Sequence, residues 1–230
     1  MPNFNQLILE DAAAKLQPLL DRIAFVGGAT LTLLITDPGA PHPRATIDVD
    51  IIAEISTHME YFDFSQRLRA IGFAEDASPE APNCRWRHGE LILDVMPLDP
   101  SILGFSNRWY PEALETAQKV RLSSGAYIRS ITAPYFLATK MEAFRGRGRG
   151  DFYASRDLED FISLIDGRKS ILAEIASAPT GTREYLSAAA GELLSQSRFL
   201  DALPGFLLPE EASQQRLPEI LGKLRQIARH

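Results

Sequence analysis

Hydrophobic residues in the first part of the chain are spaced at helical intervals in some segments and at strand intervals in others. Glycine and proline separate these segments. The predicted helices span 5–20, 29–35 and 61–71, the predicted strands span 22–26 and 46–53, and a hairpin within 84–98 turns at His88-Gly89. One hairpin beside strands joined by helices predicts an α/β (α+β) domain with a mixed sheet.

From residue 133 onward the hydrophobic pattern is helical only, and no internal repeat is visible. We therefore predict two domains, an α/β core over 1–131 and a helical C-terminal domain over 132–230. The helices predicted in the second part span 133–145, 156–165, 169–176, 183–200 and 210–228.

Composition narrows the class of protein. The 230 residues are 45% hydrophobic with a formal net charge of −6, so any contact with nucleic acid must be local. No apolar run is long enough for a membrane span, and the N-terminus lacks a signal-peptide pattern. Cys84 is the one cysteine and the four histidines are scattered, which argues against disulfides and zinc. We expect a cytoplasmic protein without membrane contact.

Two aspartates lie inside a strand that is otherwise apolar. Side chains alternate across a strand, so Asp48 and Asp50 should project from the same face. Such a pair is held at low cost if a cation lies between the carboxylates, and hard oxygen ligands suit Mg²⁺ or Mn²⁺. Asp94 lies in a second apolar strand, and if the two strands pair, three carboxylates could surround two metal ions. A solvated face of an edge strand explains the first pair about equally well.

A glycine turn precedes these strands. Gly27-Gly28 ends a predicted strand and opens a predicted helix, and Thr30 adds a hydroxyl in the first turn. Glycines allow a phosphate to approach the backbone, and a helix N-terminus offers free N–H groups. Most such turns are only turns. Followed by a strand with an Asp pair, this one predicts a phosphate site beside a metal site.

These segments resemble the AbiEii/AbiGii-type toxin nucleotidyltransferases of the polymerase-β-like nucleotidyltransferase superfamily. The similarity lies in FVGGATLTLL, in RATIDVDI (Arg44 to Ile51) and in ATKMEAFRGRGRGDFYASRDLEDF, and covers roughly residues 20–55 and 133–168. The serine that is widespread in the family's glycine turn is replaced by Gly28. The resemblance implies metal ligands at Asp48 and Asp50, with Asp94 matched by strand position only. It implies nucleotide contacts from Gly27, Gly28, Thr30, Arg44, Lys140 and Asp157, where Asp157 either lies near the nucleotide or orients Lys140.

Lys140 and the arginines after it also have simpler explanations. A lone lysine on an apolar helix often lies at its rim with the ammonium in solvent. Arginines alternate with glycines after this helix, at Arg145, Arg147 and Arg149, which predicts a cationic loop that could close over phosphates or could be only solvated. Ser155 is a predicted N-cap, and acids after an N-cap are expected for dipole reasons alone.

The function predicted from these residues is metal-dependent transfer of a nucleoside monophosphate from an NTP to an acceptor hydroxyl. Toxins of this type modify tRNA ends, so the resemblance implies tRNA or another RNA as an acceptor and a cognate antitoxin as a partner. Other relatives act on small molecules or on proteins, so the residues alone leave the acceptor open. The alternative from another class is a non-catalytic binding or regulatory module with the same fold.

Overall fold

The structure of the chain is a computed structural model that describes residues 3–147 and 150–229. The chain divides into two compact units, Met1–Thr32 with Arg44–Thr132 and Leu33–Pro43 with Ala133–His230. The second unit therefore includes a segment, 33–43, that lies within the range the sequence assigns to the first domain.

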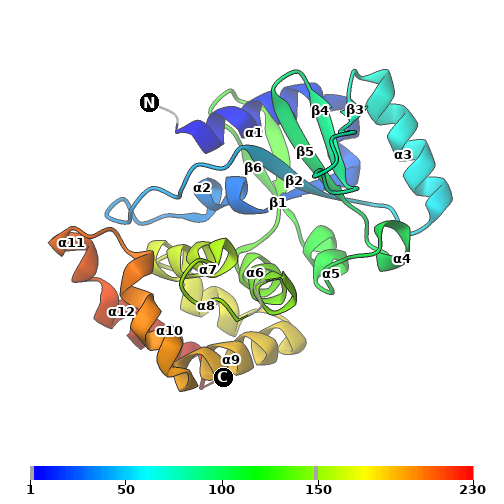
Figure 1. Cartoon of the computed structure of the whole chain (residues 1–230). Coiled ribbons are helices and arrows are strands. Elements are labelled where there is room, and N and C mark those ends of the chain that lie inside the picture. Colours follow the sequence, from blue (N-terminus) through cyan, green and yellow to red (C-terminus); the bar gives the residue numbers. More distant parts are fainter. Residues whose placement is uncertain (1–2, 148–149, 230) are drawn as a thin grey trace. The chain divides into compact units, whose positions relative to one another are not determined.

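The first unit is built on a mixed sheet of seven strands, counted over the described residues. Its strands are β1 (Ile23–Val26), β2 (Asp48–Ala53), β3 (Ala74–Glu75), β4 (Arg85–His88), β5 (Leu91–Met96), β6 (Gln118–Arg121) and β7 (Tyr127–Ser130), in the order β3-β4-β5-β2-β1-β7-β6 (Figure 1). β2 pairs in parallel with β5 and antiparallel with β1, and β4 and β5 form an antiparallel hairpin. The predicted α/β class with a mixed sheet is confirmed.

Helices and turns of the first unit connect these strands. They are α1 (Phe4–Lys15), η1 (Gln17–Arg22), η2 (Gly28–Thr30), the start of α2 (Leu31–Leu34), α3 (His58–Ala70), α4 (Pro100–Leu103) and α5 (Tyr110–Glu115). α1 begins at a capping box, in which the Asn3 side chain accepts from the Gln6 backbone N–H and the Gln6 side chain accepts from that of Asn3. Thr57 and Glu60 form the same arrangement at α3.

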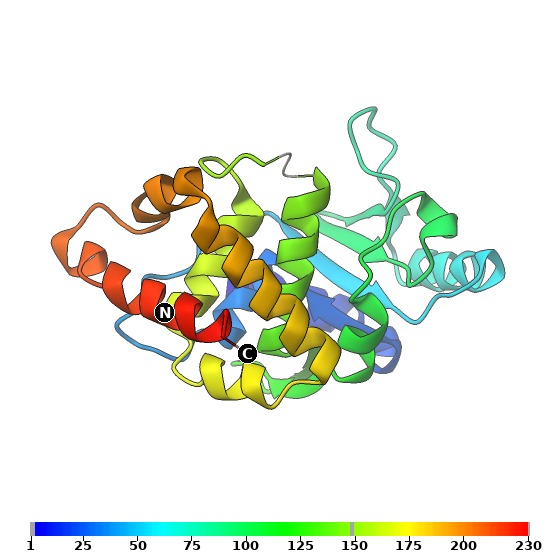
Figure 2. The ribbon, with the colours of Figure 1, turned by 90° about the horizontal axis from the view of Figure 1, so that it is seen from below.

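The second unit is helical, as the hydrophobic pattern predicts. Its elements are α6 (Ala133–Arg147), α7 (Arg156–Gly167), α8 (Ile171–Ala176), α9 (Thr180–Ser195), α10 (Ser197–Ala202), η3 (Leu203–Phe206), α11 (Glu211–Gln214) and α12 (Leu217–Ile227) (Figures 1 and 2). Ser155 is the N-cap of α7, where its hydroxyl accepts from the Leu158 N–H at 3.3 Å. α9 packs against α6 and α12.

Two long helices predicted in this unit are each broken. The pattern over 183–200 continues through Gln196, whose backbone is extended and separates α9 from α10. The hydroxyl of Ser195 there donates to the Glu192 carbonyl, a contact that competes with helical hydrogen bonding. The pattern over 210–228 is interrupted by a turn at Gln215 and Arg216. α12 begins at Leu217, with Pro218 in its first turn, where the missing backbone N–H of proline costs no helical hydrogen bond.

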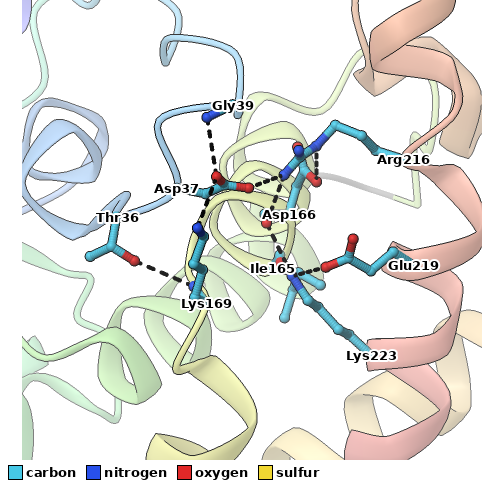
Figure 3. A network of polar contacts seen from close by, with 9 residues as sticks. All are labelled: Thr36, Asp37, Gly39, Ile165, Asp166, Lys169, Arg216, Glu219 and Lys223. Carbon is cyan, nitrogen blue, oxygen red and sulfur yellow. Dashed lines mark hydrogen bonds and ion pairs between the residues drawn. The ribbon is translucent and has the colours of Figure 1, made fainter.

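A network of polar contacts attaches segment 33–43 to the helices of the second unit (Figure 3). Arg216 reaches Asp166 with its Nε at 2.7 Å and Asp37 with an Nη at 2.8 Å. The backbone N–H groups of Thr36 and Asp37 both donate to the Gly167 carbonyl at 2.9 Å. A Cβ on Gly167 would lie 2.9 Å from Ile35, so glycine permits this close approach. The segment is held by charge, backbone hydrogen bonds and shape together.

Residues 97–132 contain elements that the sequence pattern did not indicate. α4 has four residues and α5 has six, too few for a helical period to be recognised. β6 lies at the edge of the sheet with mostly exposed side chains, so alternation between apolar and polar residues is absent. Across residues 3–147 and 150–229, no helix is both long and apolar enough to cross a membrane.

Candidate functional site

Three aspartates share one face of the sheet in the first unit. β2 and β5 run side by side, with Asp50 opposite Asp94 and Asp48 opposite Ile92. Paired positions in adjacent strands project to the same face, and so do residues two apart in one strand. Val49 and Leu93, on the other face, are fully buried. The strand pairing on which the prediction for Asp94 depended is therefore present.

An arginine that the sequence analysis missed lies among these carboxylates. Arg85 stands opposite Asp94 in the β4–β5 hairpin. Its Nε donates to Asp94 Oδ1 at 2.8 Å, and one Nη donates to Asp94 Oδ2 at 2.7 Å and to Asp48 Oδ2 at 3.2 Å. Asp94 is thus held by a bidentate guanidinium pair, the strongest geometry for such a contact.

The hairpin register explains why Arg85 was missed. His88 pairs with Leu91, so the turn is Gly89-Glu90 and not His88-Gly89 as predicted. Gly89 has a φ of 59°, a left-handed conformation that suits glycine in a tight hairpin turn. A turn one residue earlier would place Arg85 opposite Ile92 instead of Asp94. A shift of one residue in the turn therefore changes which side chains face each other.

Asp48 is oriented from a second side by residues that precede its strand. The hydroxyl of Thr46 donates to Asp48 Oδ1 at 2.5 Å. The buried Asn5 of α1 accepts from the Thr46 N–H at 3.0 Å and donates to the Arg44 carbonyl at 2.9 Å. α1 therefore fixes the segment that leads into β2, and with it the direction of the Asp48 carboxylate.

The glycine turn lies directly against Asp50. Gly27 has a φ of 77°, and a Cβ at this position would be 1.8 Å from Asp50 Oδ2. Glycine is required here both by the backbone conformation and by the carboxylate that occupies the space. The structure thus brings together the turn and the first strand of the predicted site.

The element that follows the turn is shorter than predicted. In place of a helix over 29–35, Gly28–Thr30 forms a 3-10 turn and α2 has four residues, so little helix dipole is available for a phosphate. The Thr30 hydroxyl donates to the Gly27 carbonyl at 2.8 Å, and Thr30 is fully buried. In this conformation Thr30 supports the turn, and its role as a phosphate contact stays a prediction.

Burial and neighbouring charges shift the pKa values of Arg85 and of the adjacent Cys84. The hydrogen bonds that Arg85 donates to Asp94 raise the pKa of the Arg85 guanidinium further above its ordinary value, so it is permanently charged. Burial, reinforced by the nearby carboxylates, raises the pKa of Cys84 to about 12. The Cys84 thiol therefore stays protonated at neutral pH, which makes it a poor nucleophile.

In the second unit, Lys140 of α6 lies between two aspartates of α7. Its Nζ is 2.6 Å from Asp160 Oδ2 and 3.3 Å from Asp157 Oδ1, and all three side chains are buried. Lys140 is therefore not a rim lysine with its ammonium in solvent. The contact with Asp157 is compatible with the orienting role that the resemblance implies. Asp160 was not singled out from the sequence, although its position three residues after Asp157 puts both on one helix face.

No family model and no curated protein matches this chain in sequence. Solved structures do match it. A proposed nucleotidyltransferase from H. pylori has a TM-score of 0.51 at 11% identity, covering 98% of this chain and 93% of that chain. The fold is nucleotidyltransferase-like. An antigenic nucleotidyltransferase-like protein from Paracoccidioides brasiliensis matches 86% of this chain and 93% of its own, at 19% identity and a TM-score of 0.47.

In this nucleotidyltransferase-like fold, the three carboxylates can be compared with the oxygen ligands that a divalent metal ion requires. No group of three or more His, Cys, Asp or Glu side chains is arranged to hold a metal within the described part of the chain. Asp48 and Asp50 lie on one face of β2 beside the glycine turn, and the two Asp48 oxygens accept one hydrogen bond each, from Thr46 and Arg85. Both oxygens of Asp94 accept from Arg85 alone, in a bidentate pair. Two carboxylates and phosphate oxygens fit a hard divalent cation such as Mg²⁺.

The predicted arginine loop differs in its first residues. α6 continues to Arg147, so Arg145 is helical; it forms an ion pair with Glu192 and lies 4.9 Å from the ring centre of Tyr185. Arg149 lies outside the described residues. Arg145 is therefore engaged within its own unit in this conformation.

Proposed function

We propose that the protein transfers a nucleoside monophosphate from an NTP to an acceptor hydroxyl. The observation that carries the proposal is the placement of Asp48 and Asp50 on one strand face, with Asp50 packed against the Gly27 turn, in a nucleotidyltransferase-like fold. Because the glycine turn lies directly against Asp50, phosphates bound at the backbone of this turn would lie beside the counter-ion held by the carboxylates.

The proposed role of these residues is to position the reactants. Asp48 and Asp50 would hold Mg²⁺ or Mn²⁺, which when bound neutralises phosphate charge and stabilises the leaving pyrophosphate. Thr46 and Arg85 fix the direction of the Asp48 carboxylate through hydrogen bonds to its two oxygens. The acceptor hydroxyl loses its proton to solvent and its oxygen bonds to the α-phosphorus. The bond from the α-phosphorus to the oxygen that bridges to the β-phosphate breaks, which releases pyrophosphate. Orientation and electrostatics then supply most of the rate enhancement.

Further roles in the proposal rest on the sequence resemblance. Lys140 is proposed as a contact to the nucleotide phosphates, with Asp157 orienting its ammonium group at 3.3 Å. Arg44 is proposed as a further nucleotide contact. An RNA acceptor such as tRNA, and a toxin role with an antitoxin partner, are supported by the likeness of residues 20–55 and 133–168 to AbiEii/AbiGii-type proteins. The net charge of −6 means that an RNA would be bound through a local surface.

The test is incorporation of each labelled NTP into total cell RNA in the presence of Mg²⁺. Wild type should label RNA with at least one NTP, and Asp50→Ala should abolish labelling while circular dichroism shows an unchanged fold. Asp76→Ala is the matched control, because the Asp76 side chain, which directly follows β3, pairs with Arg87 of β4 and not with Arg85. Full activity of Asp50→Ala would refute the metal assignment. Nucleotide binding without any transfer by wild type would favour a non-catalytic module.

A further inference from the structure

We propose that Arg85 takes the place of a second metal ion, so that the site binds a single divalent cation at Asp48 and Asp50. In this proposal Asp94 is a positioning residue that holds the guanidinium and does not bind metal. The inference rests on the metal-binding part of the proposed function and specifies it further.

The position of the guanidinium carries the argument. One Nη of Arg85 lies 2.7 Å from Asp94 Oδ2 and 3.2 Å from Asp48 Oδ2, and therefore bridges one oxygen of each carboxylate. A two-metal site places its ions about 3.5–4 Å apart, with carboxylates bridging or flanking them. An ion shared by Asp48 and Asp94 would compete with Arg85 for these carboxylates. Arg85 already brings a positive charge to them.

Displacement of Arg85 by a metal ion would be costly. The Asp94 side chain is only 8% exposed and both of its oxygens accept from the guanidinium. The backbone pairing of β4 with β5 keeps Arg85 opposite Asp94, so the side chain cannot leave without abandoning a bidentate pair. A guanidinium displaced from a largely buried pair loses its hydrogen bonds while the low-dielectric surroundings strengthen its repulsion of an incoming cation.

Arg87 shows that this arrangement is specific to one position. It lies two residues along β4, on the same face as Arg85, and forms an ion pair with Asp76 at 2.7 Å. Its side chain is 46% exposed, against 20% for Arg85. Both arginines lie on the same face of β4 and each pairs with an aspartate. Of the two, Arg85 reaches the proposed metal ligands and Arg87 does not, which makes Arg87 a matched control.

The experiment counts Mn²⁺ ions bound per chain, with Mn²⁺ alone as the probe, by electron paramagnetic resonance of the free ion. Wild type and Arg87→Ala should each bind one ion. Arg85→Met removes the charge while keeping much of the apolar stem, and it should bind two ions, because Asp94 and Asp48 are then open to a second cation. Asp94→Asn should still bind one ion, since Asp94 is not a ligand.

Each other outcome overturns the inference in a distinguishable way. Two ions on wild type, or one on a folded Arg85→Met, would show that Arg85 does not replace a metal, while the proposed function stands. Loss of the ion in Asp94→Asn would make Asp94 a ligand. If Arg85→Met does not fold, the Asp94→Asn count decides alone. No ion on wild type would contradict both the inference and the metal dependence of the proposed function.

Discussion

The two units of the molecule each contain an arginine shared by two aspartates. In the first unit Arg85 binds Asp94 and Asp48, with nitrogen–oxygen distances of 2.7 and 3.2 Å. In the second unit Arg216 binds Asp166 and Asp37, at 2.7 and 2.8 Å (Figure 3). The contacts are nearly the same, but the elements that supply the aspartates are different.

That difference assigns the two arginines different tasks. Asp48 and Asp94 belong to adjacent strands whose backbone ladder would keep them close without any arginine. Asp37 belongs to segment 33–43, whereas Asp166 lies near the end of α7, so Arg216 is one of the contacts that join distant parts of the chain. Arg85 neutralises carboxylates that the sheet has already assembled, whereas Arg216 assembles the structure. Variants of the two should therefore differ in stability and in their response to metal ions.

The largest loss of stability is expected for Arg216→Met. Asp166, whose side chain is 3% exposed, would lose its counter-ion, and breaking such a buried pair costs about 3 kcal/mol. Urea unfolding should show this loss, and Mg²⁺ should not restore it. Lys169→Ala is the control, because Lys169 is 68% exposed and 3.6 Å from Asp37, so its loss should cost under about 1 kcal/mol. Equal effects of the two variants would mean that Arg216 does not join the segment to the helices.

Arg85→Met should lower the free energy of unfolding by less, about 2 kcal/mol in EDTA. The reason is that the pairing of β2 with β5 still holds the carboxylates in place after their counter-ion is lost. Here Mn²⁺ should recover most of the lost unfolding free energy, since a cation can replace the guanidinium between Asp48 and Asp94. Arg87→Ala should change little in either condition. A loss of stability that metal ions cannot reverse would make Arg85 a structural residue like Arg216.

The smallest effect on the free energy of unfolding is expected at low pH, where Asp37 of the second unit is protonated. The hydrogen bond from Arg216, with a backbone hydrogen bond from Gly39, lowers the pKa of Asp37 from 3.8 to about 2. The folded pKa is the lower one, so the Asp37 carboxylate stabilises the fold above pH 3.8 and loses this contribution as the pH falls toward 2. Asp166 opposes this trend, because burial raises its pKa. Over that pH range the unfolding free energy of Asp37→Asn should fall less steeply than that of wild type, and parallel curves would contradict the assignment.

The parts of this structure that the sequence predicted are those encoded by local spacing. The common face of Asp48 and Asp50 follows from strand alternation, and the N-cap at Ser155 from residue type and position. Arg85 was missed because its partner depends on a turn that was placed one residue too early. An ion pair between residues that are distant in the chain leaves no periodic pattern in the sequence from which it could be predicted.

The contacts of Lys140 with Asp160 and of Arg216 with Asp37 join residues that are far apart in the chain or lie on different helices. Likewise, no hydrophobic pattern in 33–43 indicates that the segment belongs to the second unit. Such features depend on tertiary packing, so one sequence read by spacing alone does not show them.

The most direct test of a metal–nucleotide site at Asp48 and Asp50 is the thermal shift caused by Mg²⁺ with an NTP, which requires no knowledge of the acceptor. At a hundredfold excess over Kd, binding stabilises the folded protein by about 2.7 kcal/mol. For a chain of this size, that corresponds to about 2–4 °C in Tm for each kcal/mol. Wild type should therefore show a shift of several degrees. Asp48→Asn keeps the shape of the side chain, and should melt near wild type without ligand but lose most of the shift. Equal shifts in both proteins, or no shift in either, would contradict the account.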